Sequence, residues 1–310
     1  MRILIELPSW LGDAVMATPA IENIMNYYKN SEFIFIGSLV SIEALMNHPK
    51  VSNTFVIEKK YSSLFKISKK LGPFDIFYSF RGSFRSKILK LFISSKKKFQ
   101  FDKNNYQQNL HQVQKYNNFI NDCMETRLNP GKLILHPSLN HKNHNLKPIF
   151  GINPGSSYGV SKRWSPIKFS QIASELSNNF DILIFGGPKE KQIAAEIEKN
   201  LISRGVKNYK NISTKTSVKD LINHISTLDL FVTGDTGPMH IAAAFEVPTV
   251  AIFGPTKATE TSQWMNDKNI NIKKNLSCQP CMKRKCPLKH NNCMKLIKAD
   301  EVLSALKSLN

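Results

Sequence analysis

The sequence has no apolar run long enough to cross a bilayer. A spanning helix needs about 20 consecutive, mostly apolar residues, and no stretch approaching that length occurs in the chain. The N-terminal apolar run is interrupted by Glu6 and Pro8, which leaves it too short for the apolar core of a secretory signal peptide. Both absences argue against an integral membrane or exported protein, so we expect a cytoplasmic one.

Acidic residues are scarce. The 310-residue chain has 23 Asp and Glu against 43 Lys and Arg, a formal net charge of +20. This excess suits an anionic partner such as a nucleotide diphosphate, a phosphorylated glycolipid or an anionic membrane surface. A compositional origin is also open, because Lys, Asn and Ile are abundant throughout and many lysines would then be ordinary solvated surface. No helix-turn-helix, zinc-finger or aromatic-rich RNA-binding pattern is present, so we expect no specific nucleic-acid partner.

Cysteine is rare, and four of the five cysteines lie close together near the C-terminus. Cys278, Cys281, Cys286 and Cys293 have the spacing C-x2-C-x4-C-x6-C, whereas Cys123 is isolated. This spacing is typical of metal sites, and a cytosolic environment disfavours stable disulfides. The Lys and Arg residues between the cysteines would stabilise thiolates. The sequence leaves three states open: a structural zinc site, reduced thiols, and a disulfide formed after purification.

Strand and helix patterns alternate in two successive series. The first series predicts a helix at 62–70 and strands at 3–7, 33–37, 54–57 and 76–79. The second restarts at 149–153, with a helix at 192–201 and strands at 182–185, 230–232 and 249–253. The polar stretch 140–147 between them is the predicted linker. We therefore predict two doubly wound parallel-sheet (Rossmann-like) α/β domains, residues 1–144 and 145–310, with the last helix a candidate for packing back on the first domain.

A glycine-rich turn at 233–240 connects a predicted strand to a predicted helix. The helix end offers backbone N–H groups and a positive dipole end, which suit a phosphate, and Gly234 and Gly237 would let the backbone approach a ligand closely. Thr236 supplies a hydroxyl. Asp235 and His240 lie in or next to the same turn, so their side chains could contact a ribose or a phosphate bound there. The alternative is a purely structural turn with Asp235 or Thr236 as the helix N-cap.

The N-terminus repeats this arrangement. A strand is followed by Pro8-Ser9-Trp10-Leu11-Gly12-Asp13 and then by a helical pattern. Asp13 would lie in the first helical turn, where the helix dipole and the N–H groups favour its charged form. A charged carboxylate at the rim of a cleft can act as a general base, and the alternative is a helix-capping Asp.

Arginines follow the predicted strand that ends at Ser79. Arg81 and Arg85 are candidates for binding a phosphate or a sugar carboxylate of an acceptor through charge-assisted hydrogen bonds. The alternative is a solvated helix start.

Taken together, these motifs resemble glycosyltransferase family 9, the ADP-heptose:lipopolysaccharide heptosyltransferases. The resemblance covers nearly the whole chain and follows the family's motif order. Its motifs are 8–13, Asn153-Pro154-Gly155-Ser156-Ser157 with Lys162-Arg163-Trp164, 234–240, and Phe253-Gly254-Pro255-Thr256. The Pro-Ser-Trp opening and the cysteine cluster favour the type II heptosyltransferases over type I.

The resemblance implies a GT-B fold with the active site between its two domains. Asp13 matches the family's proposed catalytic base, and Lys162 matches a residue that neutralises charge on the leaving ADP. The positions that match donor-binding residues are Ser9, Ser156, Ser157, Glu190, Asp235, Thr236, Gly237 and His240. The alternative for Glu190 is that it is an exposed glutamate in the first turn of a helix. The alternative for His240 is that it is a histidine packed within a helix.

The implied reaction is inverting transfer of a heptose from ADP-heptose to the inner-core heptose of a heptosyl-Kdo-lipid A acceptor. No Asp-X-Asp motif is present, so no catalytic metal or other cofactor is expected. The implied location is peripheral, on the anionic inner face of the inner membrane. The alternatives are a type I enzyme acting on a Kdo acceptor and a nucleotide-sugar-binding protein without catalytic activity.

Overall fold

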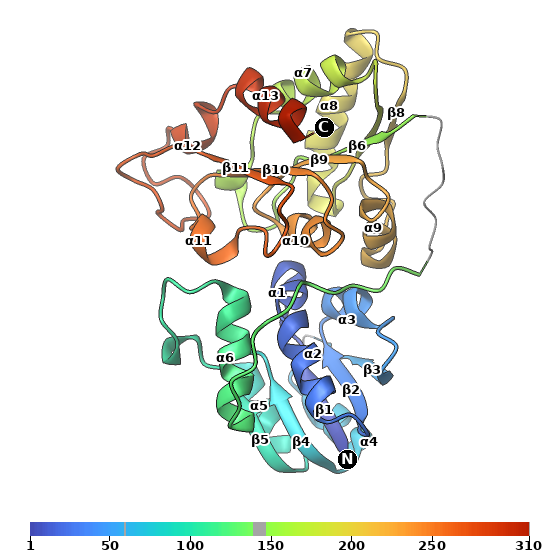
Figure 1. Ribbon diagram of the computed structural model, residues 1–310, viewed down its shortest axis with the longest axis vertical. Coiled ribbons are helices and arrows are strands. Elements are labelled where there is room, and N and C mark those ends of the chain that lie inside the picture. The colour runs from blue at the N-terminus through green and yellow to red at the C-terminus, as the bar shows by residue number, and fades with distance from the viewer. Residues whose placement is uncertain (59, 139–146, 310) are drawn as a thin grey trace. The chain divides into compact units, whose positions relative to one another are not determined.

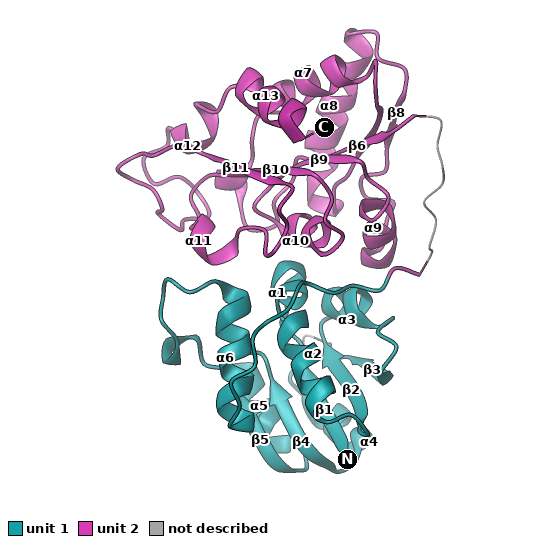
Figure 2. Cartoon of the chain, viewed as in Figure 1, with its two compact units in different colours: residues 1–136 teal, residues 137–310 magenta. Residues whose placement is uncertain are grey.

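The computed structural model describes residues 1–58, 60–138 and 147–309. The chain forms two compact units, Met1–His136 and Pro137–Asn310 (Figure 2). The predicted boundary between residues 144 and 145, and all but the last residue of the predicted linker, lie outside the described residues.

Unit 1 is built on a five-stranded parallel sheet with the strand order β3-β2-β1-β4-β5 (Figure 1). The central strand β1 pairs with β2 on one side and with β4 on the other. Its strands are β1 (Arg2–Glu6), β2 (Glu32–Gly37), β3 (Val51–Val56), β4 (Phe74–Ser79) and β5 (Ser95–Gln100). Its helices are α1 (Leu11–Met16), α2 (Thr18–Tyr27), α3 (Leu39–Leu45), α4 (Ser62–Leu71), α5 (Phe84–Phe92) and α6 (Gln112–Met124), with a 3-10 turn at Lys103–Asn105.

The helices of unit 1 form two groups. Helices α1, α2, α3 and α6 pack against one another, and α4 packs against α5. The α4–α5 pair covers the sheet through a cluster that includes Leu64, Leu71, Leu89 and Ile93. A doubly wound sheet places its helices in this way because the crossovers change face where the strand order reverses.

Two local features of unit 1 differ from the sequence prediction. The single helical pattern after Asp13 forms two helices, α1 and α2, with Pro19 in the first turn of α2. Proline lacks the N–H that a continuous helix would need there, and Thr18 Oγ1 instead donates to the carbonyl of Val15 at 2.8 Å. Strand β5 was not predicted, because its sequence Ser-Lys-Lys-Lys-Phe-Gln lacks an apolar run.

Unit 2 is built on a six-stranded parallel sheet with the order β11-β10-β9-β6-β7-β8. Its strands are β6 (Ile149–Asn153), β7 (Asp181–Ile184), β8 (Tyr209–Asn211), β9 (Leu230–Gly234), β10 (Thr249–Phe253) and β11 (Asn269–Lys273). Its helices are α7 (Pro166–Leu176), α8 (Lys191–Ser203), α9 (Val218–Ile225), α10 (Gly237–Ala244), α11 (Ala258–Thr261), α12 (Asn292–Lys295) and α13 (Ala299–Leu309), with 3-10 turns at Val160–Lys162 and Pro188–Glu190. The short strands β8 and β11 were not predicted.

The last helix, α13, belongs to unit 2. It packs against α7 and strands β9, β10 and β11. Val302 and Leu306 are fully buried in the core of that unit. This apolar face is therefore filled within unit 2, and packing of the last helix on the N-terminal domain stays a prediction.

The predicted fold class is confirmed, since each unit is a doubly wound parallel sheet. The strand order reverses beside β1 in unit 1 and beside β6 in unit 2. Ligands of such sheets bind beyond the carboxyl ends of the strands at these reversal points. Among the described residues, no helix combines the length and apolar character that crossing a membrane requires.

Candidate active site

Lys162 and Asp235 form a buried ion pair at the carboxyl edge of the unit 2 sheet. Lys162 lies in the 3-10 turn after β6, and Asp235 directly follows β9. Lys162 Nζ donates to Asp235 Oδ2 at 2.6 Å and to the Asp235 carbonyl at 2.9 Å. The hydroxyl of Thr256, which follows β10, donates to the same Oδ2 at 2.6 Å. The loops after β6, β9 and β10 thus together hold the Lys162 ammonium group where the strand order of the sheet reverses.

The N-terminus of α10 lies at the same edge. Thr236 occupies the N-cap position, as one of the two sequence alternatives proposed, but its side chain makes no capping hydrogen bond. Its hydroxyl instead accepts from Asn153 Nδ2 at 3.1 Å and lies 3.2 Å from Thr233 Oγ1. The helix therefore begins at Gly237 without side-chain capping, which leaves its positive end available to an anion.

Two buried oxygens at this edge lack hydrogen-bond partners among the described residues. They are Ser156 Oγ, in the loop after β6, and Glu190 Oε1, in the 3-10 turn after β7. Glu190 is 5% exposed, so the alternative of an exposed helix glutamate is wrong. The two loops touch closely, since a Cβ at Gly155 would lie 2.0 Å from Glu190 Cγ. Buried polar atoms normally have partners, and a ligand hydroxyl is a natural partner for a carboxylate oxygen.

The other predicted donor positions of unit 2 differ in exposure. His240 is buried within α10, at 3% exposure, whereas Ser157 is exposed. The structure brings Ser156, Lys162, Asp235 and Thr236 to one sheet edge. Thr233 and Thr256 were not predicted as site residues. The available signal was that Thr233 lies near the carboxyl end of one buried strand and that Thr256 closely follows another.

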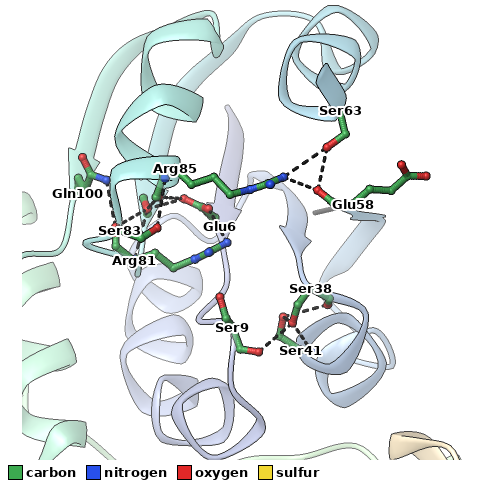
Figure 3. Close-up of polar contacts among 12 residues, drawn as sticks. Glu6, Ser9, Ser38, Ser41, Glu58, Ser63, Arg81, Ser83, Arg85 and Gln100 are labelled. Carbon is green, nitrogen blue, oxygen red and sulfur yellow. Dashed lines mark hydrogen bonds and ion pairs between the residues drawn. The ribbon is translucent and has the colours of Figure 1, made fainter. Parts of the chain in front are cut away.

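In unit 1, Asp13 lies in the first turn of α1, as predicted. The N-cap is Trp10, so the alternative that Asp13 caps the helix is wrong. Burial raises the pKa of Tyr116 on α6 well above its usual value, and the negative charge of Asp13 raises it further. Ser9 precedes the helix, and its carbonyl accepts from Ser38 Oγ at 3.0 Å (Figure 3).

Arg81 is committed to an internal ion pair with Glu6. Its Nη1 lies 3.1 Å from Glu6 Oε1, and Glu6 is 1% exposed (Figure 3). The Glu6 carboxylate also accepts from the hydroxyls of Ser79, at 2.6 Å, and Ser86. Burial raises the pKa of Glu6, and Arg81 and the two serines oppose that shift. The acceptor-binding role of Arg81 stays a prediction. It requires that Arg81 bind the acceptor while it keeps its ion pair with Glu6.

Arg85 ties the start of α5 to the segment before α4. Its Nη2 donates to the carbonyl of Glu58 and lies 3.3 Å from Ser63 Oγ (Figure 3). Its guanidinium also lies 5.6 Å from the centre of the Tyr61 ring. These contacts give Arg85 a structural role in unit 1, and its acceptor-binding role stays a prediction.

The comparison with protein families decides which family this chain belongs to. The model of glycosyltransferase family 9 (heptosyltransferase) matches residues 64–292. The chain belongs to glycosyltransferase family 9. Lipooligosaccharide heptosyltransferase 2 of Campylobacter jejuni is 41% identical to it over 317 aligned positions, which cover 100% of this chain and 98% of the relative. The resemblance seen in the sequence motifs is thereby confirmed.

Solved structures of the family share the fold. The Escherichia coli ADP-heptose lipopolysaccharide heptosyltransferase II superposes with a TM-score of 0.82 at 21% identity, covering 100% of this chain and 98% of that one. A family 9 glycosyltransferase from Veillonella parvula gives a TM-score of 0.83 at 18% identity, covering 99% and 96%. At these identities the likeness establishes the fold, which is the GT-B type that the motifs predicted.

The four C-terminal cysteines of this family 9 glycosyltransferase line one cavity in unit 2. Burial raises the pKa of the Cys293 thiol, and the neighbouring cysteines raise it further. The backbone N–H of Asn291 donates to Cys286 Sγ at 3.4 Å. All four are free thiols in the structure, and zinc binding stays a prediction.

A second group of residues with atoms that can bind a metal ion lies in unit 1. Among the described residues, Glu22, His48 and His136 form the group whose candidate metal-binding atoms all lie within 4.8 Å of one another. His48 Nδ1 accepts from the backbone N–H of Lys50 at 3.2 Å, so its Nε2 carries the proton and donates to Glu22 Oε1 at 2.5 Å. Glu22 and His48 thus form a hydrogen-bonded contact between α2 and the turn before β3, and the His136 ring packs edge to face on His48 with ring centres 4.7 Å apart.

We expect Arg81→Met to lower the free energy of unfolding by about 3 kcal/mol at mildly alkaline pH. The variant leaves the Glu6 carboxylate buried without its counter-charge. Because the folded-state pKa of Glu6 is raised, the loss should grow as pH rises from the ordinary carboxyl range through that raised pKa, and it should shrink at acidic pH, where Glu6 holds a proton. Urea unfolding at several pH values measures the effect.

The matched control for that variant is Glu6→Gln/Arg81→Met, which removes both charges. Its stability should show little of the added pH dependence. Equal stability of Arg81→Met and the unmodified protein at alkaline pH would contradict a structural ion pair.

Proposed function

We propose that this protein transfers a heptose from ADP-heptose to the inner-core heptose of lipopolysaccharide, as a type II heptosyltransferase. The observation that carries the proposal is the carboxyl edge of the unit 2 sheet. It combines one buried cation, one uncapped helix N-terminus and two buried oxygens that have no hydrogen-bond partner in the described part of the chain. Family membership and the likeness to heptosyltransferase 2 enzymes supply the sugar and the acceptor.

In this proposal unit 2 binds the ADP part of the donor. The diphosphate lies at the N-terminus of α10, near Gly237 and Lys162, and the ribose hydroxyls pair with Glu190. Ser156 and Ser157 contact the diphosphate from the loop after β6, with Asp235, Thr236 and His240 near the donor sugar and its phosphates. Lys162 neutralises the charge that develops on the leaving ADP, which is how a glycosyltransferase without a bound cation stabilises its transition state.

Asp13 is the general base of the proposed mechanism. It takes the proton of the acceptor hydroxyl as that oxygen attacks the anomeric carbon of the heptose, and the bond to ADP breaks on the opposite side. One displacement inverts the anomeric centre, so no covalent sugar–enzyme intermediate forms. Ser9 contacts the donor beside Asp13, and Arg81 and Arg85 are the proposed acceptor contacts.

The test of the reaction is an ADP-release assay with ADP-heptose and two acceptors. One acceptor carries Kdo alone, and the other carries heptose on Kdo. Release with the second acceptor and little with the first supports type II. Preference for the Kdo acceptor would assign type I. ADP-heptose binding without release on either acceptor would leave only a nucleotide-sugar-binding protein.

The reaction itself requires no cofactor in this proposal, while the four cysteines are a candidate structural zinc site. The support for zinc is their spacing and their shared cavity. Metal analysis of protein purified under reducing conditions tests it. One zinc per chain that is lost in Cys281→Ser supports the site, and a metal-free, fully active protein would show that the cysteines need no zinc.

We also propose that the protein adsorbs to the anionic inner face of the inner membrane, where a lipid-linked acceptor is available. The excess of positive charge supports this. Sedimentation with anionic vesicles should show binding that weakens as added salt screens the charges, whose range falls to about 8 Å at physiological ionic strength. Absence of binding at low salt would show that the charge is merely compositional.

A further inference from the structure

The outward surface of α4 and α5 in unit 1 combines exposed apolar side chains with lysines. The inner surfaces of both helices pack on the sheet through Leu64, Leu71, Leu89 and Ile93. We define the aromatic–lysine face as the outward residues of this helix pair. They are Tyr61, which directly precedes α4, together with Phe65, Lys66, Lys69, Lys70, Phe84, Lys87, Leu91 and Phe92.

Its apolar members are unusually exposed. Leu91 is 78% and Phe84 is 72% exposed, and they are the two most exposed large apolar side chains among the described residues. They lie seven positions apart on α5, that is, on one side of the helix. Phe65 of α4 and Phe92 of α5 pack edge to face, with ring centres 5.7 Å apart, and both remain nearly half exposed. The apolar side chains therefore form one surface across two helices, and such grouped exposure marks an interaction site.

The charge around these side chains has one sign. From Lys60 to Lys98 the only acidic residue is Asp75, and it pairs with Lys96 at 2.7 Å. The four lysines of the face have no carboxylate partner in the parts of the chain that the structure describes. Lys69 lies over the Phe65 ring, with Nζ 4.3 Å from its centre. Unneutralised lysines beside exposed rings are arranged as in interfacial membrane-binding surfaces, where rings and aliphatic chains enter the headgroup region and lysines contact anionic headgroups.

We propose that the aromatic–lysine face is the surface by which this protein docks on an anionic lipid bilayer, with Phe84 and Leu91 inserted among the lipids. The complementary charge selects an anionic partner. The exposed aliphatic Leu91 favours lipid over nucleic acid, because leucine has no π-face on which a base can stack. This inference rests on the proposed function in one respect, that the acceptor is held in a membrane. It adds which surface of the protein binds the bilayer and how that surface binds.

The first experiment reverses charge on the face. Vesicles of phosphatidylethanolamine with phosphatidylglycerol are sedimented with Lys66→Glu/Lys69→Glu/Lys87→Glu. A lysine near an anionic surface contributes about fivefold in affinity, so loss of the three positive charges alone should weaken binding about 100-fold, and the introduced negative charges should weaken it further. The matched control is Lys199→Glu/Lys207→Glu/Lys210→Glu, with the same change in net charge on exposed positions of unit 2. Equal losses in the two variants would overturn the proposal, because they would show that only net charge matters.

The second experiment tests insertion. Phe84→Ser/Leu91→Ser should weaken vesicle binding by roughly tenfold or more and remove most of the binding that survives added salt. The control Ile167→Ser/Ile202→Ser removes two other exposed apolar side chains, from unit 2, and should leave binding unchanged. In Leu91→Trp, the emission added to that of the three native tryptophans should shift to the blue on vesicles and be quenched by lipids with brominated acyl chains. Unquenched emission from vesicle-bound Leu91→Trp would overturn insertion.

Two further measurements separate this proposal from its alternatives. Tighter binding of single-stranded RNA than of vesicles, lost in the same Lys variants, would assign the face to nucleic acid and overturn the proposal. The face variants should retain full turnover on a deacylated, water-soluble acceptor. Absence of heptose transfer in the unmodified protein, with vesicle binding still confined to the face, would remove the proposed function and leave the docking surface standing.

Discussion

Replacing Asp13 by Asn is expected to lower turnover by roughly 10²–10⁴-fold, the usual contribution of a general base. Asn has the shape of Asp but cannot take the acceptor's proton. ADP affinity should change little, because the proposed diphosphate site belongs to unit 2. Steady-state assays with saturating donor, together with calorimetry of ADP binding, measure the two effects separately.

A control variant must reproduce the effect that loss of the Asp13 charge has on helix stability. Asp13 lies in the first turn of α1, where a negative charge stabilises the helix by about 0.3–1 kcal/mol. Asp300→Asn removes an exposed carboxylate from the first turn of α13 and should leave turnover intact. Near-normal turnover in Asp13→Asn, at matched thermal stability, would return Asp13 to a structural role.

Replacing Lys162 by Met is expected to weaken ADP binding by roughly 10- to 100-fold, since a hydrogen bond from a charged group contributes about 1.5–3 kcal/mol. Turnover should fall as well, because charge on the departing ADP loses its partner. The side chains of Lys162 and Asp235 are 10% and 6% exposed, so the variant also leaves a buried carboxylate unpaired. Calorimetry with ADP measures the affinity, and thermal unfolding monitors the structural cost.

The double variant Lys162→Met/Asp235→Asn separates these two effects. With no unpaired charge left, its stability should exceed that of Lys162→Met. Its ADP affinity should remain low, because the cation is still missing. Recovery of normal ADP affinity in the double variant would mean that Lys162 acts only by holding Asp235, and would remove it from the phosphate site.

The sequence by itself determined the alternation of strands and helices. Buried parallel strands read as apolar runs, and their ends are marked by glycine and proline, so both doubly wound sheets could be predicted. The same rule fails for β5, whose three successive lysines carry no apolar pattern even though β5 pairs along the whole of β4. Pairing with a neighbour decided that strand, and local sequence does not report it.

Motif spacing also determined the candidate residues, because each follows a predicted strand and parallel strands present their carboxyl ends at one edge. The tertiary structure alone decided their partners. Lys162 and Asp235 are 73 positions apart, and Arg81 and Glu6 are 75 apart. Arg81 was predicted to be available for an acceptor, whereas the fold pairs it with the buried carboxylate of Glu6. Charge can be counted along a chain, but a buried charge takes whichever counter-charge the packing brings within reach, and only the folded arrangement of strands sets that distance.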